Sequence, residues 1–118
     1  MAAVPECLRS TLELNSIPPV NLPGWIGDFA FAFVDESNLE DIISFLGNAG
    51  GDANQVFWNK VHSLPRTDED WESLLYVGGE MTEESGAMMK ARDKRVVEII
   101  RSRFSGPERF VHELFRRR

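Results

Sequence analysis

The alternation of hydrophobic and polar positions predicts a mainly helical chain. Apolar side chains recur at intervals of three and four residues, the spacing of one helix face. Glycine, proline and capping residues separate these repeats. Helices are predicted over about 6–14, 37–47, 52–64, 67–75 and 82–104, with a short amphipathic segment at 107–115. We therefore expect residues 1–118 to form one mainly α domain, a compact bundle of about five to six helices.

Capping residues indicate where several of these helices begin. Ser37 with Glu40, and Ser105 with Glu108, have the spacing of a capping box, in which each side chain satisfies a free backbone amide. Three further starts carry a residue that can cap the first turn: Asp52, Thr67 and Thr82. Acidic residues follow Thr67 and Thr82, where the helix dipole favours negative charge.

The stretch 18–34 is harder to assign. Two adjacent prolines exclude a helix at residues 18–19 and predict an extended segment up to Pro23. Beyond it, Phe29, Phe31 and Phe33 alternate as in a strand, while other apolar positions in 25–34 keep helical spacing. We expect a short buried helix at 25–34, because the rest of the chain offers no clear strand partner. A buried strand is the alternative.

Periodicity also predicts the core. The chain is 42% hydrophobic, with eight phenylalanines and three tryptophans. We expect the tryptophans, Trp25 included, to be buried, together with Leu75 and Met89 on their helix faces. The residues expected to share one core are Leu39, Ile42, Ile43, Leu46, Trp58, Trp71, Ile100 and Phe104.

Composition favours an intracellular protein, cytoplasmic or nuclear. A single cysteine, Cys7, cannot form an internal disulfide, and the first residues lack the features of a secretory signal. The most apolar stretch, 22–34, contains Asp28 and is shorter than the roughly 20 residues that span a bilayer. We expect no membrane partner.

Charge is distributed unevenly along the chain. Residues 1–89 carry three basic and fifteen acidic side chains, whereas 90–118 carry ten basic and four acidic ones. The candidate partner-binding residues are Lys90, Arg92, Lys94, Arg95, Arg101 and Arg103. If the last long helix is continuous, we expect them to form a basic, solvent-facing surface opposite Val96, Ile100 and Phe104. The plainer interpretation is that these residues balance helix dipoles and the acidic part of the chain.

Motifs for nucleotide or metal binding are incomplete. The glycine cluster at 47–51 lacks the preceding strand and the following Lys-Ser or Lys-Thr of a phosphate loop. Asp68, Asp70 and Glu72 alternate like a calcium loop, but Ser73 and Gly79 occupy the positions that require glycine and glutamate. Magnesium bridged to a phosphate would need carboxylates from elsewhere in the chain. We expect neither a metal nor another cofactor.

Nucleophilic and zinc chemistry are no better supported. His62 and His112 lie far apart in the sequence, with no ligand at zinc-binding spacing. Cys7 lies in no catalytic motif, and we expect it to be a small buried apolar residue.

The leading hypothesis is a non-catalytic helical protein-interaction module, that is, an adaptor or regulatory domain that binds another protein. If the basic residues form the binding site, we expect the partner to have an acidic surface. The same charge separation would let two copies pair across a two-fold axis. The first alternative is a nucleic-acid-binding protein that uses residues 90–118, as a monomer or dimer. The weaker alternative is an enzyme whose site forms only in the fold.

Overall fold

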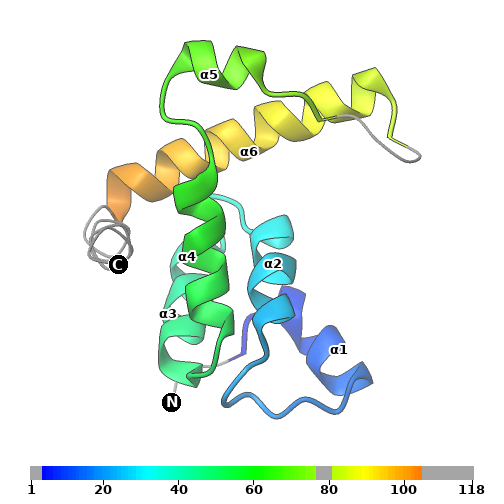
Figure 1. Cartoon of the computed structure of the whole chain (residues 1–118). Coiled ribbons are helices and arrows are strands. Elements are labelled where there is room, and N and C mark those ends of the chain that lie inside the picture. The colour runs from blue at the N-terminus through cyan, green and yellow to red at the C-terminus, as the bar shows by residue number, and fades with distance from the viewer. Residues whose placement is uncertain (1–3, 77–80, 105–118) are drawn as a thin grey trace.

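Six helices form the described part of the chain, residues 4–76 and 81–104, in the computed structural model (Figure 1). They are α1 (Glu6–Leu14), α2 (Gly24–Phe33), α3 (Leu39–Ala49), α4 (Ala53–Ser63), α5 (Asp68–Ser73) and α6 (Glu83–Arg103). The expected mainly helical fold is confirmed, and residues 24–33 form a helix rather than a strand.

Helices α2 and α4 begin side by side and run in the same direction. An isolated parallel bridge joins Leu22 to Gly51, just ahead of the two helices. The amide of Leu22 donates to Gly50 O at 3.0 Å, and Leu22 O accepts from the Asp52 amide at 3.0 Å. Gly50 and Gly51 have positive φ angles of 76° and 84°, which favour glycine at this turn. The bridge therefore aligns the first turns of α2 and α4.

Close approach of the two backbones depends on Gly27. A Cβ atom at this position would collide with Ala53 O and would lie 2.8 Å from the amide nitrogen of Phe57. Both contacts are with the backbone of α4, which cannot move aside as the end of a flexible side chain can. Glycine at position 27 thus sets the separation of α2 from α4.

Helix α3, which links α2 to α4 in the chain, runs antiparallel to both and packs against α4, and α1 lies beside α2 (Figure 1). The α2–α3 turn is closed by Asp35 and Asn38. Asp35 Oδ1 accepts from the amides of Ser37 and Asn38 at 2.8 and 3.0 Å, and Asn38 Oδ1 accepts from the Asp35 amide at 2.7 Å. The predicted Ser37–Glu40 capping box is therefore wrong, because Asp35 already satisfies the local amides.

Helix α6 crosses the ends of α2 and α4, and α5 lies along its outer side (Figure 1). Thr82 caps α6 and forms a capping box with Ser85. Thr67 caps α5 by accepting from the Asp70 amide at 3.1 Å. Both predicted starts are confirmed, since a threonine cap satisfies amides within its own helical turn.

Other helix ends differ from the prediction. Helix α3 continues past Gly47 to Ala49, and α5 ends at Ser73. Asp52 precedes α4, but its side chain makes no capping hydrogen bond. The predicted segment 107–115, with its capping box at Ser105, lies outside the described residues.

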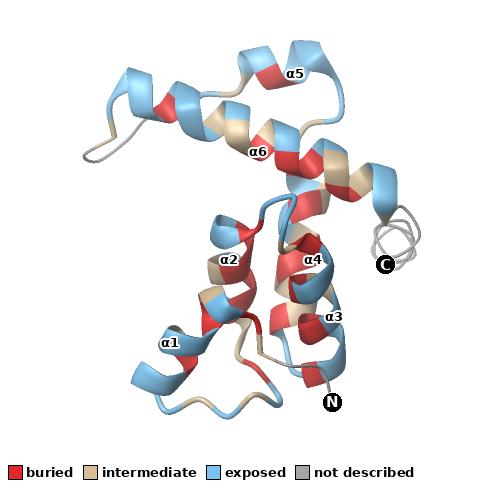
Figure 2. Cartoon of the chain, turned by 180° about the vertical axis from the view of Figure 1, so that it is seen from behind, coloured by how far each residue is buried: buried red, intermediate tan, exposed pale blue. Residues whose placement is uncertain are grey.

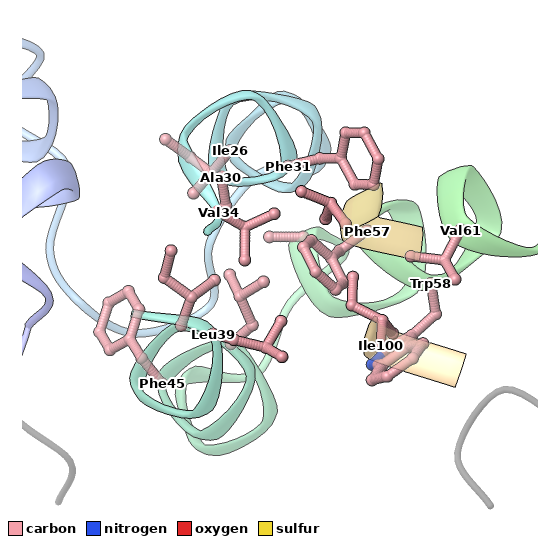
Figure 3. Packing of buried hydrophobic residues seen from close by; sticks show 14 of the residues in the cluster. Ile26, Ala30, Phe31, Val34, Leu39, Phe45, Phe57, Trp58, Val61 and Ile100 are labelled. Carbon is pink, nitrogen blue, oxygen red and sulfur yellow. The ribbon is translucent and has the colours of Figure 1, made fainter. Parts of the chain in front are cut away.

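Side chains from α2, α3 and α4 point toward a common centre (Figure 3). Six of the eight residues predicted to share the core are buried, and Ile43 and Phe104 pack against them from partly buried positions. Three other burial predictions are wrong: Trp25, Met89 and Leu75 are 46%, 46% and 77% exposed. Trp25 and Met89 lie on helix faces that turn away from the bundle, and Leu75 lies beyond the end of α5. Figure 2 shows burial concentrated on the inner faces of α2 to α4 and on one side of α6.

Among the described residues, no helix combines the length and apolar character needed to cross a membrane.

The close contact at Gly27 gives a stability prediction. Gly27→Ala should lower the free energy of unfolding by about 1–3 kcal/mol, because α2 must move away from α4. Gly47→Ala is the matched control, since a Cβ at that exposed site in α3 meets no atom within 4 Å. It should leave stability unchanged or raise it by up to about 1 kcal/mol. Urea unfolding of both variants tests the contact, and equal effects would contradict it.

Candidate functional site

The predicted basic residues flank the buried stripe of α6. The stripe consists of Gly86, Asp93, Val96, Val97 and Ile100. Since each helical residue advances by about 100°, Arg92 projects to one side of this stripe and Arg101 to the other. The predicted single solvent-facing surface is therefore wrong.

Arg101 caps the end of α4. Its guanidinium donates to the carbonyl oxygens of Val61, Leu64 and Pro65 at 2.9, 2.9 and 2.7 Å. The last carbonyls of a helix have no partner within the helix and carry the negative end of its dipole. A cation that hydrogen-bonds to these carbonyls supplies the missing donors and also neutralises the dipole charge.

Arg92 does the same for α2. It donates to the carbonyls of Phe31 and Val34, and its central carbon lies 5.1 Å from the centroid of the Phe31 ring. It also forms a 2.7 Å ion pair with Asp93, which is 5% exposed. Arg101 follows Arg92 by nine positions, about 14 Å of helix, so α6 can bind the ends of two neighbouring helices.

Asp93 extends this polar cluster to the segment after α5. The Tyr76 hydroxyl donates to Asp93 Oδ2 at 2.8 Å. Burial of Tyr76, together with the hydrogen bond and negative charge of Asp93, raises the pKa of the hydroxyl well above its usual value. The Tyr76 carbonyl also faces Gly86, where a Cβ would collide with it. The sequence motifs gave no signal for this cluster, because Tyr76 and Asp93 lie on different elements.

Most of the other predicted basic residues also make internal contacts. Lys90 donates to Leu74 O at 3.0 Å, Lys94 pairs with Asp68 at 3.1 Å, and Arg103 pairs with Glu36 at 3.4 Å. Arg95 is exposed and lines, together with Arg92, a cavity beside Asp35 and Glu36 of the α2–α3 turn. Five of the six candidates therefore contact other elements of the chain. Arg92 also contacts its buried neighbour Asp93.

The remaining candidates from the sequence do not converge. Burial raises the pKa of the half-buried Cys7 thiol, which disfavours its reactive thiolate form. His62 is half-buried and lies 3.5 Å from Arg66. The described residues contain no group of three His, Cys, Asp or Glu side chains that could hold a metal ion. His112 lies outside the described residues.

An exposed row of aromatic rings on α2 is the surface feature that sequence reasoning missed. Trp25, Phe29 and Phe33, hereafter the aromatic stripe, lie one helical turn apart. The rings of Trp25 and Phe29 meet edge to face at 6.3 Å, and those of Phe29 and Phe33 are 4.7 Å apart. Trp25 and Phe33 are 46% and 48% exposed, and Phe29 is partly buried.

The helical period explains this exposure. The opposite face of α2 carries Ile26, Gly27, Ala30 and Phe31, all buried against the bundle. The i, i+4, i+8 spacing of the aromatic stripe is visible in the sequence. This spacing alone does not show which of the two apolar faces of α2 is buried. The buried face is set by the close approach of α2 and α4 at Gly27.

Acidic groups border the aromatic stripe. Asp28 is exposed on α2 itself, Asp52 lies beside Gly24 at the Trp25 end, and Asp35 follows α2 at the Phe33 end. Hydrogen bonds from Ser37 and Asn38 lower the pKa of Asp35, so it stays ionised at neutral pH. Asp28 and Asp52 therefore give the apolar surface a negatively charged border, whereas Asp35 lies beside Arg92 and Arg95, which line the same cavity.

The sequence matches no protein-family model, and neither curated proteins nor solved structures show significant similarity to it.

The capping role of Arg101 predicts a stability effect. Arg101→Met keeps much of the aliphatic length but removes three charge-assisted hydrogen bonds, so the free energy of unfolding should fall by roughly 1–3 kcal/mol. Arg95→Met, on the exposed face of the same helix, should change it by less than about 0.5 kcal/mol. Thermal and urea unfolding provide the measurement. A similar decrease in the free energy of unfolding for both variants would show that the positive charge of α6, and not the cap on α4, stabilises the fold.

Tyr76 predicts a pH dependence. Its pKa is higher in the folded chain than the unfolded value of about 10, so its contribution is fully present below pH 10. Above that pH the unfolded state loses its proton first, and this contribution declines toward the folded pKa. The wild type should therefore lose more stability than Tyr76→Phe between about pH 8 and pH 11. Urea unfolding at both pH values tests this, and an equal loss would contradict it.

Because Tyr76 is the chain's single tyrosine, phenolate absorbance provides an independent control. In Asp93→Asn the phenolate should form at lower pH than in the wild type, since the negative charge is gone.

Proposed function

We propose that this chain is a non-catalytic helical protein-interaction module that binds its partner through the aromatic stripe. The observation that carries the proposal is the exposure of Trp25 and Phe33, each nearly half accessible, in one continuous row with Phe29. Large aromatic residues are enriched among those that dominate the binding energy of protein interfaces.

The energetic argument concerns the surface left open to water. An aromatic side chain buries on the order of 200 Å² when fully covered. Half of that, at about 25 cal/mol per Å², corresponds to roughly 2–3 kcal/mol for each of Trp25 and Phe33. A partner that covers both rings would recover much of this free energy on binding.

Rigidity of α2 supports the same role. The helix is aligned at its start by the Leu22–Gly51 bridge, contacts α4 at Gly27 and is capped at its end by Arg92. A preorganised binding surface loses little conformational entropy on association. The aromatic stripe is thus presented in a fixed geometry, as helix-mediated recognition requires.

The basic residues of α6 are a less suitable partner site than the sequence suggests. Arg92 and Arg101 are engaged by helix ends, and any partner would have to compete with those carbonyls. A nucleic-acid role through 90–104 meets the same difficulty, and the acidic border of the aromatic stripe would repel phosphate. We therefore place the proposed interaction on α2.

Affinity capture from extract of cells that make the protein tests this function. The baits are the wild type, Trp25→Ser/Phe33→Ser, and a control, Leu75→Ser/Met88→Ser, which removes exposed apolar side chains from a distant surface. A protein retained by the wild type and the control should fall about tenfold or more with the α2 variant, because two interface anchors are lost.

Circular dichroism should first establish that all three baits are equally folded. An identical set of captured proteins on all three would overturn the proposed site. Recovery of nucleic acid rather than protein would favour the alternative function.

A further inference from the structure

Resting on the proposed function, we infer that the partner element is a basic amphipathic helix, whose apolar side packs on the aromatic stripe and whose flanking Lys or Arg residues meet the acidic border. The inference has two parts: the shape of the aromatic stripe favours a helix, and the surrounding charge selects a basic one.

The shape argument begins with the spacing of the rings. Trp25, Phe29 and Phe33 form an i, i+4, i+8 row, a ridge about 12 Å long on the outside of α2. Ridges of this kind fit the grooves between side-chain rows of a second helix. A partner helix with apolar residues at i, i+3 or i+4, and i+7 presents a stripe of matching length.

The charge argument comes from a long stretch of sequence. Residues 10–59, which include α2, α3 and the turns beside them, contain seven acidic side chains and no Lys, Arg or His. Asp28 and Asp52 from this stretch are exposed beside the aromatic stripe, and Asp35, which follows α2, lies next to Arg92. The negative potential of Asp28 and Asp52 would steer a basic segment toward the stripe and repel an acidic one.

The same charges disfavour a second copy of this chain as the occupant. The aromatic stripe is symmetric about Phe29, so an antiparallel pair of α2 helices would place Trp25 against the partner's Phe33. That arrangement would also bring the acidic borders together, Asp28 facing Asp28, with no basic residue on either α2. A like-charge interface of this kind is disfavoured, whereas a basic helix gains from every one of these carboxylates.

The two features have different energetic roles. Ion pairs at an exposed border change affinity by at most about fivefold each and are screened by salt. The aromatic stripe should therefore supply most of the affinity, and the carboxylates should decide which helices bind and how fast they associate. This division gives the two parts separate experimental signatures.

The test is a displayed library of helical peptides, each with an apolar stripe of the stated spacing and with its flanking positions randomised among Lys, Glu, Gln and Ser. The library is selected on the full-length wild-type chain and counter-selected on Trp25→Ser/Phe33→Ser. Enriched peptides should carry net positive charge. One enriched peptide, synthesised and labelled, should bind the α2 variant at least about thirtyfold more weakly, by fluorescence anisotropy.

Charge reversal then isolates the second part. Asp28→Lys/Asp52→Lys should weaken binding of that basic peptide about fivefold to twentyfold at low salt and make its affinity less dependent on salt. Asp41→Lys/Glu98→Lys reverses two exposed acids on α3 and α6, changes the net charge equally, and is the matched control that should have a smaller effect. A peptide with Glu in place of Lys should bind the doubly reversed variant better than the wild type.

The outcomes separate the two proposals. Stripe-dependent peptides that are neutral or acidic would overturn the basic partner and leave docking on α2 intact. If no peptide is enriched after the counter-selection, or if an enriched peptide binds the α2 variant as tightly as the wild type, both proposals are overturned. A dimer that sedimentation velocity detects in the wild type and that Phe29→Ser abolishes would identify a second copy as the occupant and also overturn the basic partner.

Discussion

Two helix ends and two arginines organise this structure. The carbonyl ends of α2 and α4 point toward the same side of the molecule, and each would leave unsatisfied acceptors with negative dipole charge there. Arg92 and Arg101, on opposite sides of the buried stripe of α6, each bind one of these ends. The position of α6 therefore depends on α2 and α4 being parallel neighbours, which in turn depends on the Leu22–Gly51 bridge and on the close approach at Gly27.

This arrangement gives the basic residues of α6 a structural role. In the described portion of α6 the positive charges mostly complement groups within the protein: helix ends, Asp93, and acids on α5 and the α2–α3 turn. The acidic and basic parts of the sequence are thus partly neutralised by the fold. Outside these contacts, the exposed acids Asp28 and Asp52 remain beside the aromatic stripe.

Structure and proposed function meet in α2. One face of the helix builds the core, its backbone contacts α4, and its end binds Arg92, while the remaining face carries three aromatic rings to the surface. The opposite face of α2 packs against the bundle. Rotation of α2 that buried the exposed rings would therefore break the contact at Gly27. The same constraints that stabilise the bundle keep the aromatic stripe at the surface.

The sequence by itself determined the helical class, the approximate positions of the six described helices and the caps at Thr67 and Thr82, because these depend on interactions within about one helical turn. It also favoured a helix at 25–34 and identified most of the core. Only the tertiary structure decided which face of α2 is buried, that Asp35 replaces Ser37 at the start of α3, and that the basic residues of α6 separate onto two flanks. Those outcomes depend on which elements meet. Gly27 packs against Ala53 and Phe57, and Arg101 hydrogen-bonds to Val61. Each of these contacts joins residues that are distant in the sequence, so no local sequence pattern predicts it.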